Sequence, residues 1–500
     1  MATMAAPIVH GKAVASQLKA NTLNLFDATV IATSSVAPAY SLAATVGLIF
    51  AFVALSSPAA ILVSFVPVLF IAFAYYYLNR MDPNCGASYA WISRTLNPQI
   101  GWLSGWVQLA ANILFCASAP IVAGTYTMQL LNSIFPGQIS ADAATNKYLI
   151  AVIGIAWLAF VTFMVVRGIR VTANFQWALV AIEYLIVLGF SVFAFIKIIA
   201  GHSAANHISA SWFNPGSTTV AALAGGLALG VFFFWGWDTA ANVNEETKEA
   251  DKTPGRAGII SMFVLLFIFL VASAAIQAFL SQSAISDPNN QSDILYFFAQ
   301  QLAPSPFTYL MILAVLSSTV AVIQTTLLPS SRLSFSMARD GVFPKAFAII
   351  HRRWLTPWVG TLLSSVLAIG IVLLTLFVSS INNVFGNLIL NIGVLVCFYY
   401  GITGIACAWA FRKVLRRNVS MFLFAGLLPV AGGLFLFALA GYIVYNNVTG
   451  SIPVLVTMGL GIPLLVIAVL ANRTGFFTEK TVSYVEVNGK LQSVSSGSPS

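Results

Sequence analysis

Two apolar stretches of this sequence carry polar residues at their centres, where they could hold a small molecule. The first is "IATSSVAPAYS", residues 31–41, in which three consecutive hydroxyl residues precede Pro38. The second is "FFFWGWDTAANVNEETKEADKTPGR", in which Gly236 and Asp238 interrupt an aromatic run. Carboxylates and unpaired backbone groups are costly inside an apolar segment, so they persist where they line a cavity or bind a ligand.

The composition indicates that the surrounding segments cross a membrane. Of the 500 residues, 59% are hydrophobic and 7% are charged, against roughly 25% charged residues in a soluble domain. Apolar runs of about 20 residues, long enough to span a ~30 Å hydrocarbon core, recur from residue 23 to residue 471. These runs are continuous rather than alternating, which argues against transmembrane strands and predicts an all-α membrane protein.

Twelve spans are predicted, at residues 23–51, 58–79, 97–131, 147–166, 172–200, 219–247, 255–282, 306–331, 357–379, 384–411, 419–446 and 450–471. With the amino terminus in the cytoplasm, all 23 Lys and Arg residues except Lys147 and Lys197 fall on the cytoplasmic side. This asymmetry follows the positive-inside rule. It predicts a multi-pass protein of the cell (plasma or inner) membrane with both termini cytoplasmic. The net charge of +9 then reflects topology, and no nucleic-acid partner is expected.

The two interruptions lie five spans apart, in the first and sixth helices. Broken helices at corresponding positions of two halves point to a secondary transporter built from inverted repeats, with its site at mid-membrane. The half-helix ends at each break offer dipoles for an anion and a cation. Two simpler interpretations stay open: the first segment is a Pro-kinked packing helix with back-bonded hydroxyls, and Asp238 is a helix N-cap.

Three stretches resemble the amino acid, polyamine and organocation permeases. "DPNCGASYAWISRTLNPQIGWLSGW", residues 82–106, is similar to the family's Pro-x-x-Gly-x-x-Tyr-x-x-x-x-Arg segment. "GWDTAANVNEETKEADKTPGRA", residues 236–257, resembles its Gly-aromatic-Asp, Glu-Glu, Pro-Arg sequence, and "SRLSFSMARDGVFPKAF", residues 331–347, its Ser-Arg, Ala-Arg-Asp-Gly, Pro signature. The resemblance covers about residues 20–475 and implies a five-plus-five inverted-repeat (leucine-transporter-like) fold with broken helices 1 and 6.

The same resemblance implies a substrate between the two breaks, beside helices 3 and 8. A substrate carboxylate would meet amides at the first break, and an ammonium would meet carbonyls at the sixth. The implied substrate-binding residues are Thr33, Ser34, Ser35, Val36, Phe234, Trp235, Gly236, Trp237 and Asp238, with Tyr89 and Gln108 as further candidates. Relatives usually have a glycine-rich first break, whereas no glycine stands between Ile31 and Thr45 here. Hydroxyl side chains then narrow the pocket, and amines without a carboxylate stay open as substrates.

The domain organisation follows from the spans and the resemblance. Residues 1–22 are a predicted cytoplasmic tail, residues 23–411 the transport core of helices 1 to 10, and residues 412–471 two peripheral helices. Residues 472–500, ending in "SVSSGSPS", are predicted to form a disordered cytoplasmic tail. We expect no cofactor and no metal, because the four cysteines stand at no metal-ligand or redox spacing: Cys85, Cys116, Cys397 and Cys407.

Glu183 is the candidate coupling residue. It lies about eleven residues into the fifth helix, ~16 Å at 1.5 Å per residue, near the bilayer centre. Some proton-coupled relatives hold a lysine near this position; a buried glutamate could take up and release a proton in each cycle, or be purely structural. Ser318 and Thr319 could offer oxygen ligands to Na⁺, but such residues also pack helices. A proton is therefore favoured over sodium.

The favoured function is a permease that moves an amino acid or related amine by alternating access, with Arg339, Asp340, Glu245 and Glu246 as candidate gate charges on the cytoplasmic side. If they are surface ion pairs, they contribute little. An exchanger of the same fold and a non-transporting nutrient sensor are the alternatives. A channel fits broken, aromatic-lined helices less well. A membrane enzyme is disfavoured because the histidines fall in predicted tails or loops: His10, His202, His207 and His351.

Overall fold

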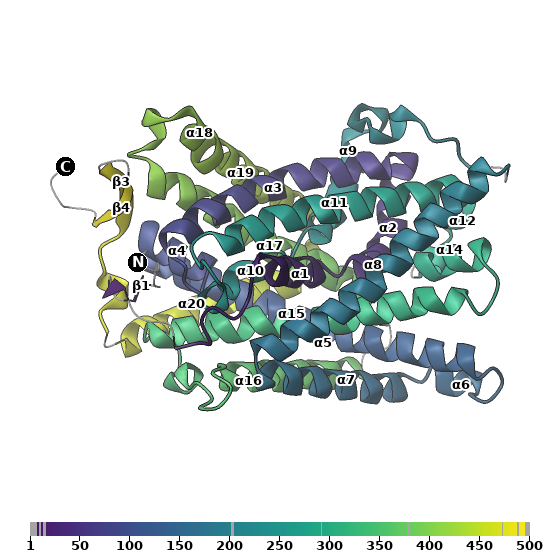
Figure 1. The fold of residues 1–500 in the computed structure, drawn as a ribbon, viewed down its shortest axis with the longest axis horizontal. Helices are drawn as coiled ribbons and strands as arrows, with labels where there is room; N and C mark the ends of the chain where they lie inside the picture. The colour runs from purple at the N-terminus through teal and green to yellow at the C-terminus, as the bar shows by residue number, and fades with distance from the viewer. Residues whose placement is uncertain are drawn as a thin grey trace.

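The protein is a bundle of long helices (Figure 1). The computed structural model describes residues 8–9, 12–13, 17–201, 205–291, 293–377, 381–472, 474–487 and 490–495, so His10 and His202 lie outside the described residues. In this part of the chain, ten helical stretches are long and apolar enough to cross a membrane. One of them, Leu25–Met81, contains two spans, and the shorter apolar helix Val220–Phe233 completes the predicted twelve.

The spans lie close to their predicted limits, although α15, predicted to end at residue 331, continues to Arg339. Their bounds are α1 (Leu25–Val36) with α2 (Pro38–Val53), α3 (Ser57–Met81), α5 (Pro98–Ile134), α7 (Lys147–Arg167), α8 (Ile169–Ile199), α9 (Val220–Phe233) with α10 (Thr239–Asn242), α11 (Thr253–Phe279), α15 (Thr308–Arg339), α16 (Trp358–Thr375), α17 (Ile381–Phe411), α18 (Val419–Met421) with α19 (Leu428–Asn446), and α20 (Val448–Ala471).

Shorter elements connect the spans at the two ends of the bundle. They are α4 (Ser88–Thr95), α6 (Ala141–Ala144), α12 (Gln282–Ser286), α13 (Pro288–Gln291), α14 (Ile294–Leu302) and the strands β1 (Ile8–Val9), β2 (Lys12–Ala13), β3 (Val482–Val487) and β4 (Lys490–Ser495). Strands β1, β3 and β4 lie near α4 at the left of Figure 1, and we call this end of the bundle the terminal face. The opposite end, with α6, α12 and α14, is the distal face.

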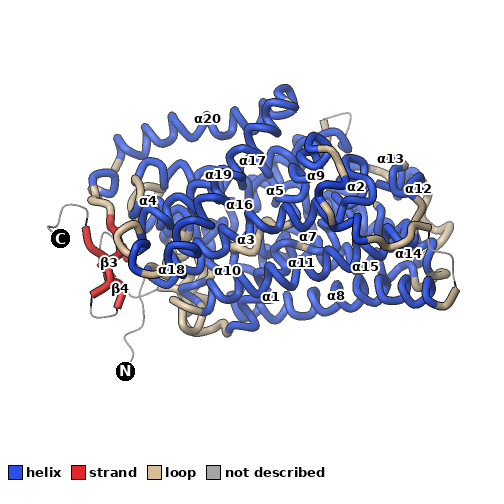
Figure 2. The backbone as a smooth tube through the Cα atoms, turned by 90° about the horizontal axis from the view of Figure 1, so that it is seen from above, coloured by secondary structure: helices blue, strands red, loops and turns tan. Residues whose placement is uncertain are grey.

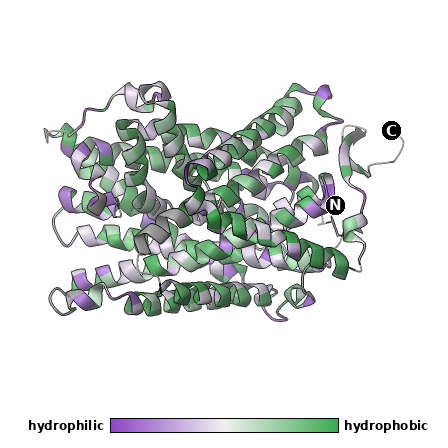
Figure 3. Ribbon diagram, turned by 180° about the vertical axis from the view of Figure 1, so that it is seen from behind, coloured by the Kyte–Doolittle hydropathy of each residue, from purple (hydrophilic) through white to green (hydrophobic). Residues whose placement is uncertain are grey.

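The packing places α5 and α15 at the centre and α20 at the edge. Of the most apolar stretch of each helix, 78% is buried in α5, 89% in α15 and 11% in α20. Figure 2 shows α20 along one border of the bundle. Hydrophobic residues cover the helices, while hydrophilic ones gather mainly in the connections at the two ends (Figure 3). This distribution suits helices whose sides face lipid.

The C-terminal tail differs from the predicted disordered extension over the residues that the structure describes. Strands β3 and β4 pair antiparallel from Val482–Ser495 to Val487–Lys490. Tyr484 is 2% exposed, and its ring lies 5.0 Å from that of Phe411 in α17. The buried aromatic ring explains why a segment of mostly polar composition is held in place.

Candidate functional site

The first helix breaks at Ala37. This residue separates α1 from α2 and has φ 50° and ψ 68°, in the left-handed region. Pro38, at the first position of α2, suits a helix start because it has no N–H to leave unpaired. The predicted break is thus confirmed, one residue beyond the predicted site stretch 33–36.

Two of the three hydroxyls before this break serve the helix itself. Thr33 and Ser34 donate to main-chain oxygens one turn earlier, at 3.2 and 3.1 Å, as the packing interpretation expected. The hydroxyl of Ser35 has no partner among the described residues. Ser35 is therefore the member of this trio that is free to bind a ligand.

The sixth helix breaks between Phe233 and Thr239, where Gly236 has φ +115°. A Cβ atom on Gly236 would lie 2.5 Å from the carbonyl oxygen of Ser35. An L-residue is strained in this conformation and would also strike the neighbouring backbone. The backbones of the two breaks therefore meet, and a glycine is required where they touch.

Asp238 is the last residue of the second break and is 3% exposed. Its Oδ1 accepts from the Tyr400 hydroxyl at 2.9 Å. Its Oδ2 accepts from three other side chains: Tyr399 at 3.2 Å, Gln108 at 3.3 Å and Tyr75 at 3.4 Å. Asp238 stands at the N-cap position of α10, as the simpler interpretation expected, but its side chain makes no capping bond to that helix. All four donors are neutral, and no ion pair to Asp238 occurs within the described residues.

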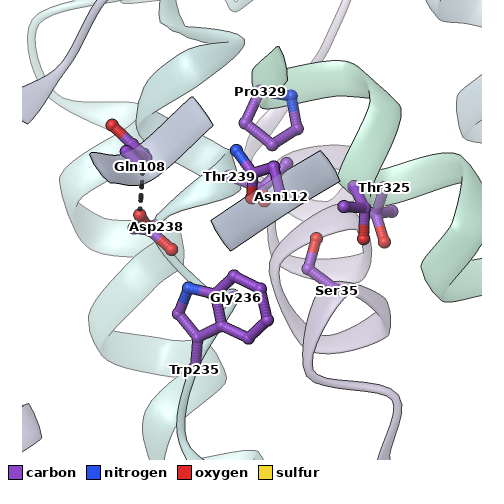
Figure 4. A pocket seen from close by; sticks show the side chains of 10 residues that line it. Ser35, Gln108, Asn112, Trp235, Gly236, Asp238, Thr239, Thr325 and Pro329 are labelled. Atoms are coloured by element: carbon purple, nitrogen blue, oxygen red, sulfur yellow. Dashed lines mark hydrogen bonds between the residues drawn. The ribbon is translucent and has the colours of Figure 1, made fainter. Parts of the chain in front are cut away.

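A narrow pocket opens beside this carboxylate (Figure 4). Its lining residues are Ser35, Gln108, Asn112, Trp235, Gly236, Asp238, Thr239, Thr325, Thr326 and Pro329. Its volume is about 10 Å³, roughly the room for one water molecule. Three buried polar atoms of its lining have no partner among the described residues: Ser35 Oγ, Gln108 Oε1 and Asn112 Nδ2. Unpaired polar atoms in a buried pocket are available to a ligand.

The structure brings four of the nine predicted substrate-binding residues to this pocket: Ser35, Trp235, Gly236 and Asp238. The other five, Thr33, Ser34, Val36, Phe234 and Trp237, do not line it. Phe234 packs edge-on against Phe65 and Phe269, and Trp237 against Tyr75. Gln108 lines the pocket as expected, whereas the Tyr89 hydroxyl donates to Asp340 at 2.8 Å. The role of these residues in binding stays a prediction.

Glu183 on α8 reaches the first break. It is fully buried, and its Oε1 accepts from the Ala39 N–H at 2.6 Å and from the Ser318 hydroxyl at 2.8 Å. The Ser318 oxygen in turn accepts from the Tyr40 N–H at 3.2 Å. Glu183 Oε2 has no partner among the described residues. Glu183 therefore ties α8 and α15 to the start of α2.

The two residues proposed for sodium are both engaged elsewhere. Thr319 donates to a main-chain oxygen of its own helix at 2.7 Å, and Ser318 donates to Glu183. Within the described ranges, no group of three His, Cys, Asp or Glu residues could hold a metal ion. A hydroxyl that donates its proton keeps oxygen lone pairs, so the role of Ser318 and Thr319 toward sodium stays a prediction.

Buried ion pairs join the segment after α10 to the last turns of α15. Glu246 accepts two bonds from Arg332, at 2.9 and 3.0 Å, and both side chains are fully buried. Glu245 accepts two from Arg339, at 3.0 and 2.9 Å. The alternative that these gate charges are weak surface pairs is therefore wrong, since removing one partner of a buried pair costs about 3–5 kcal/mol.

Comparison with known proteins decides the family. The model of a family described as "Amino acid permease" matches residues 23–466, most of the chain. The chain belongs to this amino acid permease family. The permease is therefore a multi-pass membrane protein and a secondary transporter of the amino acid and amine class, not an enzyme.

Several curated relatives are similar to the permease over much of its length. The low-affinity putrescine importer PlaP of Escherichia coli (strain K12) is 26% identical over 392 residues, 75% of this chain and 78% of the relative. Asc-type amino acid transporter 1 of Mus musculus is 28% identical over 291 residues, 57% of this chain and 51% of the relative. The methylthioribose transporter of Bacillus subtilis (strain 168) is 24% identical over 309 residues, 60% of this chain and 63% of the relative.

Proposed function

We propose that the permease carries a substrate with an ammonium group, which binds the Asp238 carboxylate in the pocket between the two breaks. The observation that carries the proposal is a buried carboxylate held by four neutral donors, with no ion-pair partner among the described residues. An isolated buried charge is unfavourable until a counter-charge reaches it. Two of the relatives named above are a putrescine importer and an amino acid transporter, whose substrates contain amines.

Trp235 supports the same assignment. Its indole N–H donates to the Tyr399 hydroxyl at 2.7 Å, and that hydroxyl donates to Asp238. The network fixes the indole at the pocket wall beside the carboxylate. An ammonium between the two would gain the ionic contact and a cation–π attraction of up to ~2 kcal/mol.

Transport by alternating access requires the pocket to open. At about 10 Å³ it is too small for an amine, so this conformation is closed. We propose that both termini are cytoplasmic and that the terminal face is the inner gate. The Glu246–Arg332 and Glu245–Arg339 pairs hold this gate shut, and they separate when the carrier opens inward.

Proton coupling is proposed to run through Glu183. The ionised carboxylate accepts from both Ala39 and Ser318, and a charged acceptor makes stronger bonds than a neutral one. Uptake of a proton weakens the tie between α8 and the start of α2. The charge state of Glu183 thereby controls the first break, and transport follows a proton gradient rather than a sodium gradient.

Reconstituted vesicles test these proposals. Labelled amines and amino acids are offered under an imposed proton or sodium gradient. Asp238→Asn should reduce uptake of every ammonium substrate by about tenfold or more, and Glu183→Gln should remove the dependence on the proton gradient. Asp293→Asn is the matched control, because Asp293 is held by Tyr126 and Gln129 in a similar way but does not line the pocket. Wild-type uptake by Asp238→Asn would refute the ammonium site.

A further inference from the structure

The start of α2 has only two main-chain donors to offer a ligand. Pro38 has no N–H, and the Ser41 N–H already donates to the Ala37 carbonyl at 2.8 Å. The N–H groups of Ala39 and Tyr40 remain, as expected for the first turn of a helix. At the break itself, the Ala37 N–H donates to the Ser34 carbonyl at 3.1 Å.

Both of these N–H groups already donate to side chains of the protein. The Glu183 carboxylate accepts from Ala39, and the Ser318 oxygen accepts from Tyr40. A carboxylate at a helix N-terminus is favourably placed, because the free N–H groups and the helix dipole both attract negative charge. A substrate carboxylate bound at the start of α2 would need these same two donors. In this chain the protein supplies the anion itself, as the carboxylate of the fully buried Glu183.

The charges near the site agree with this reading. Asp238 and Glu183 are both buried, and neither has an ion-pair partner among the described residues. A zwitterionic amino acid would add a third carboxylate, and none of the described residues that line the pocket is cationic. Burying such a group unpaired is costly. A substrate whose only charged groups are ammonium groups would instead reduce the net negative charge of the buried site.

We infer that the substrate of the permease is an organic amine without an α-carboxylate, the decarboxylated counterpart of an amino acid. This inference rests on the proposed function, because it takes Asp238 as the ammonium site. The unpaired Oε1 of Gln108 is a further acceptor beside Asp238, and it suits a group that has three N–H donors and no acceptor.

Matched pairs of compounds test the inference. The purified permease is offered phenylalanine and phenethylamine, leucine and isoamylamine, lysine and cadaverine, and ornithine and putrescine, and binding is measured by calorimetry and by ligand-induced thermal stabilisation. In the pairs that bind, the amine should bind about tenfold or more tightly than its amino acid. Tighter binding of the amino acid would overturn the inference and leave the ammonium site standing. Binding of neither member in any pair would overturn both.

Variants at the built-in anion give a second test. Glu183→Ala frees the Ala39 N–H, so the binding affinity of the amino acid in each pair should rise about tenfold or more relative to that of its amine. Glu183→Gln keeps an oxygen for Ala39 and should shift the preference much less. If Glu183→Ala does not fold, Ser318→Ala frees the Tyr40 N–H alone, and the preference should move the same way by a smaller factor. An unchanged preference in the folded variants would contradict the inference.

Discussion

Gly236→Ala is the substitution that most directly probes the contact between the two breaks. An alanine held at φ +115° would store about 1–3 kcal/mol of backbone strain. Its Cβ would also lie 2.5 Å from the Ser35 carbonyl oxygen and 2.8 Å from the carbonyl carbon, and such overpacking costs a further ~1–3 kcal/mol. We therefore expect a loss of about 2–6 kcal/mol in the free energy of unfolding.

Transport should suffer more than stability, because the displaced atoms belong to both half-helix ends at the pocket. Thermal unfolding in detergent and uptake into vesicles measure the two effects. Gly189→Ala in α8 is the matched control: a Cβ there meets no atom within 4 Å, and replacing a glycine inside a helix gains about 0.5–1 kcal/mol. If Gly236→Ala had the same unfolding temperature and the same uptake rate as the wild type, the two breaks would not be in contact as described.

Further predictions concern the terminal face. Arg332→Met leaves the fully buried Glu246 carboxylate without its partner and should lower the free energy of unfolding by about 3–5 kcal/mol. Adding Glu246→Leu should restore most of this stability, because it removes the unpaired charge. Equal stability of the single and double variants would contradict the prediction. Burial, and then the charge of Glu245, raises the pKa of the Cys85 thiol well above its usual value, so the reactive thiolate is scarce. With the other cysteines replaced, maleimide should label Cys85 slowly at neutral pH and faster as the pH rises, and rapid neutral labelling of the closed protein would disprove the burial.

The transmembrane architecture was predictable because each span is a long apolar run, and such a run has one stable form in lipid. The two breaks were also predictable, from Pro38 and Gly236. The residue at which α1 ends before the first break was not predictable, since nothing in the sequence prevents a helix from continuing through Thr33 and Ser34. Their hydroxyls bond back within α1, a choice that composition does not reveal.

The pocket itself was predicted only in part. Asn112 and Thr325 line it, but they stand on long helices whose facing sides depend on how the spans cross. The same holds for Tyr399 and Tyr400, which reach Asp238 from α17. Tertiary packing alone brings these side chains together.

The C-terminal hairpin carried a signal that composition obscured. The sequence "VSYVEVNGKLQSV" has strand-forming valine and tyrosine residues before Asn-Gly and further apolar residues after it, which together indicate a hairpin. The serine-rich ending drew the prediction toward disorder instead. The Asn-Gly turn signal between strand-forming residues is more informative here than overall polarity.

The left-handed alanine at residue 37 bears on how the first helix moves. Glycine at such a joint would let the backbone rotate over a wide range of angles. The methyl group of Ala37 removes much of this range, and the observed left-handed conformation lies about 1–2 kcal/mol above the right-handed helical one. The two halves of the helix should therefore sample fewer relative orientations than a glycine joint would allow them.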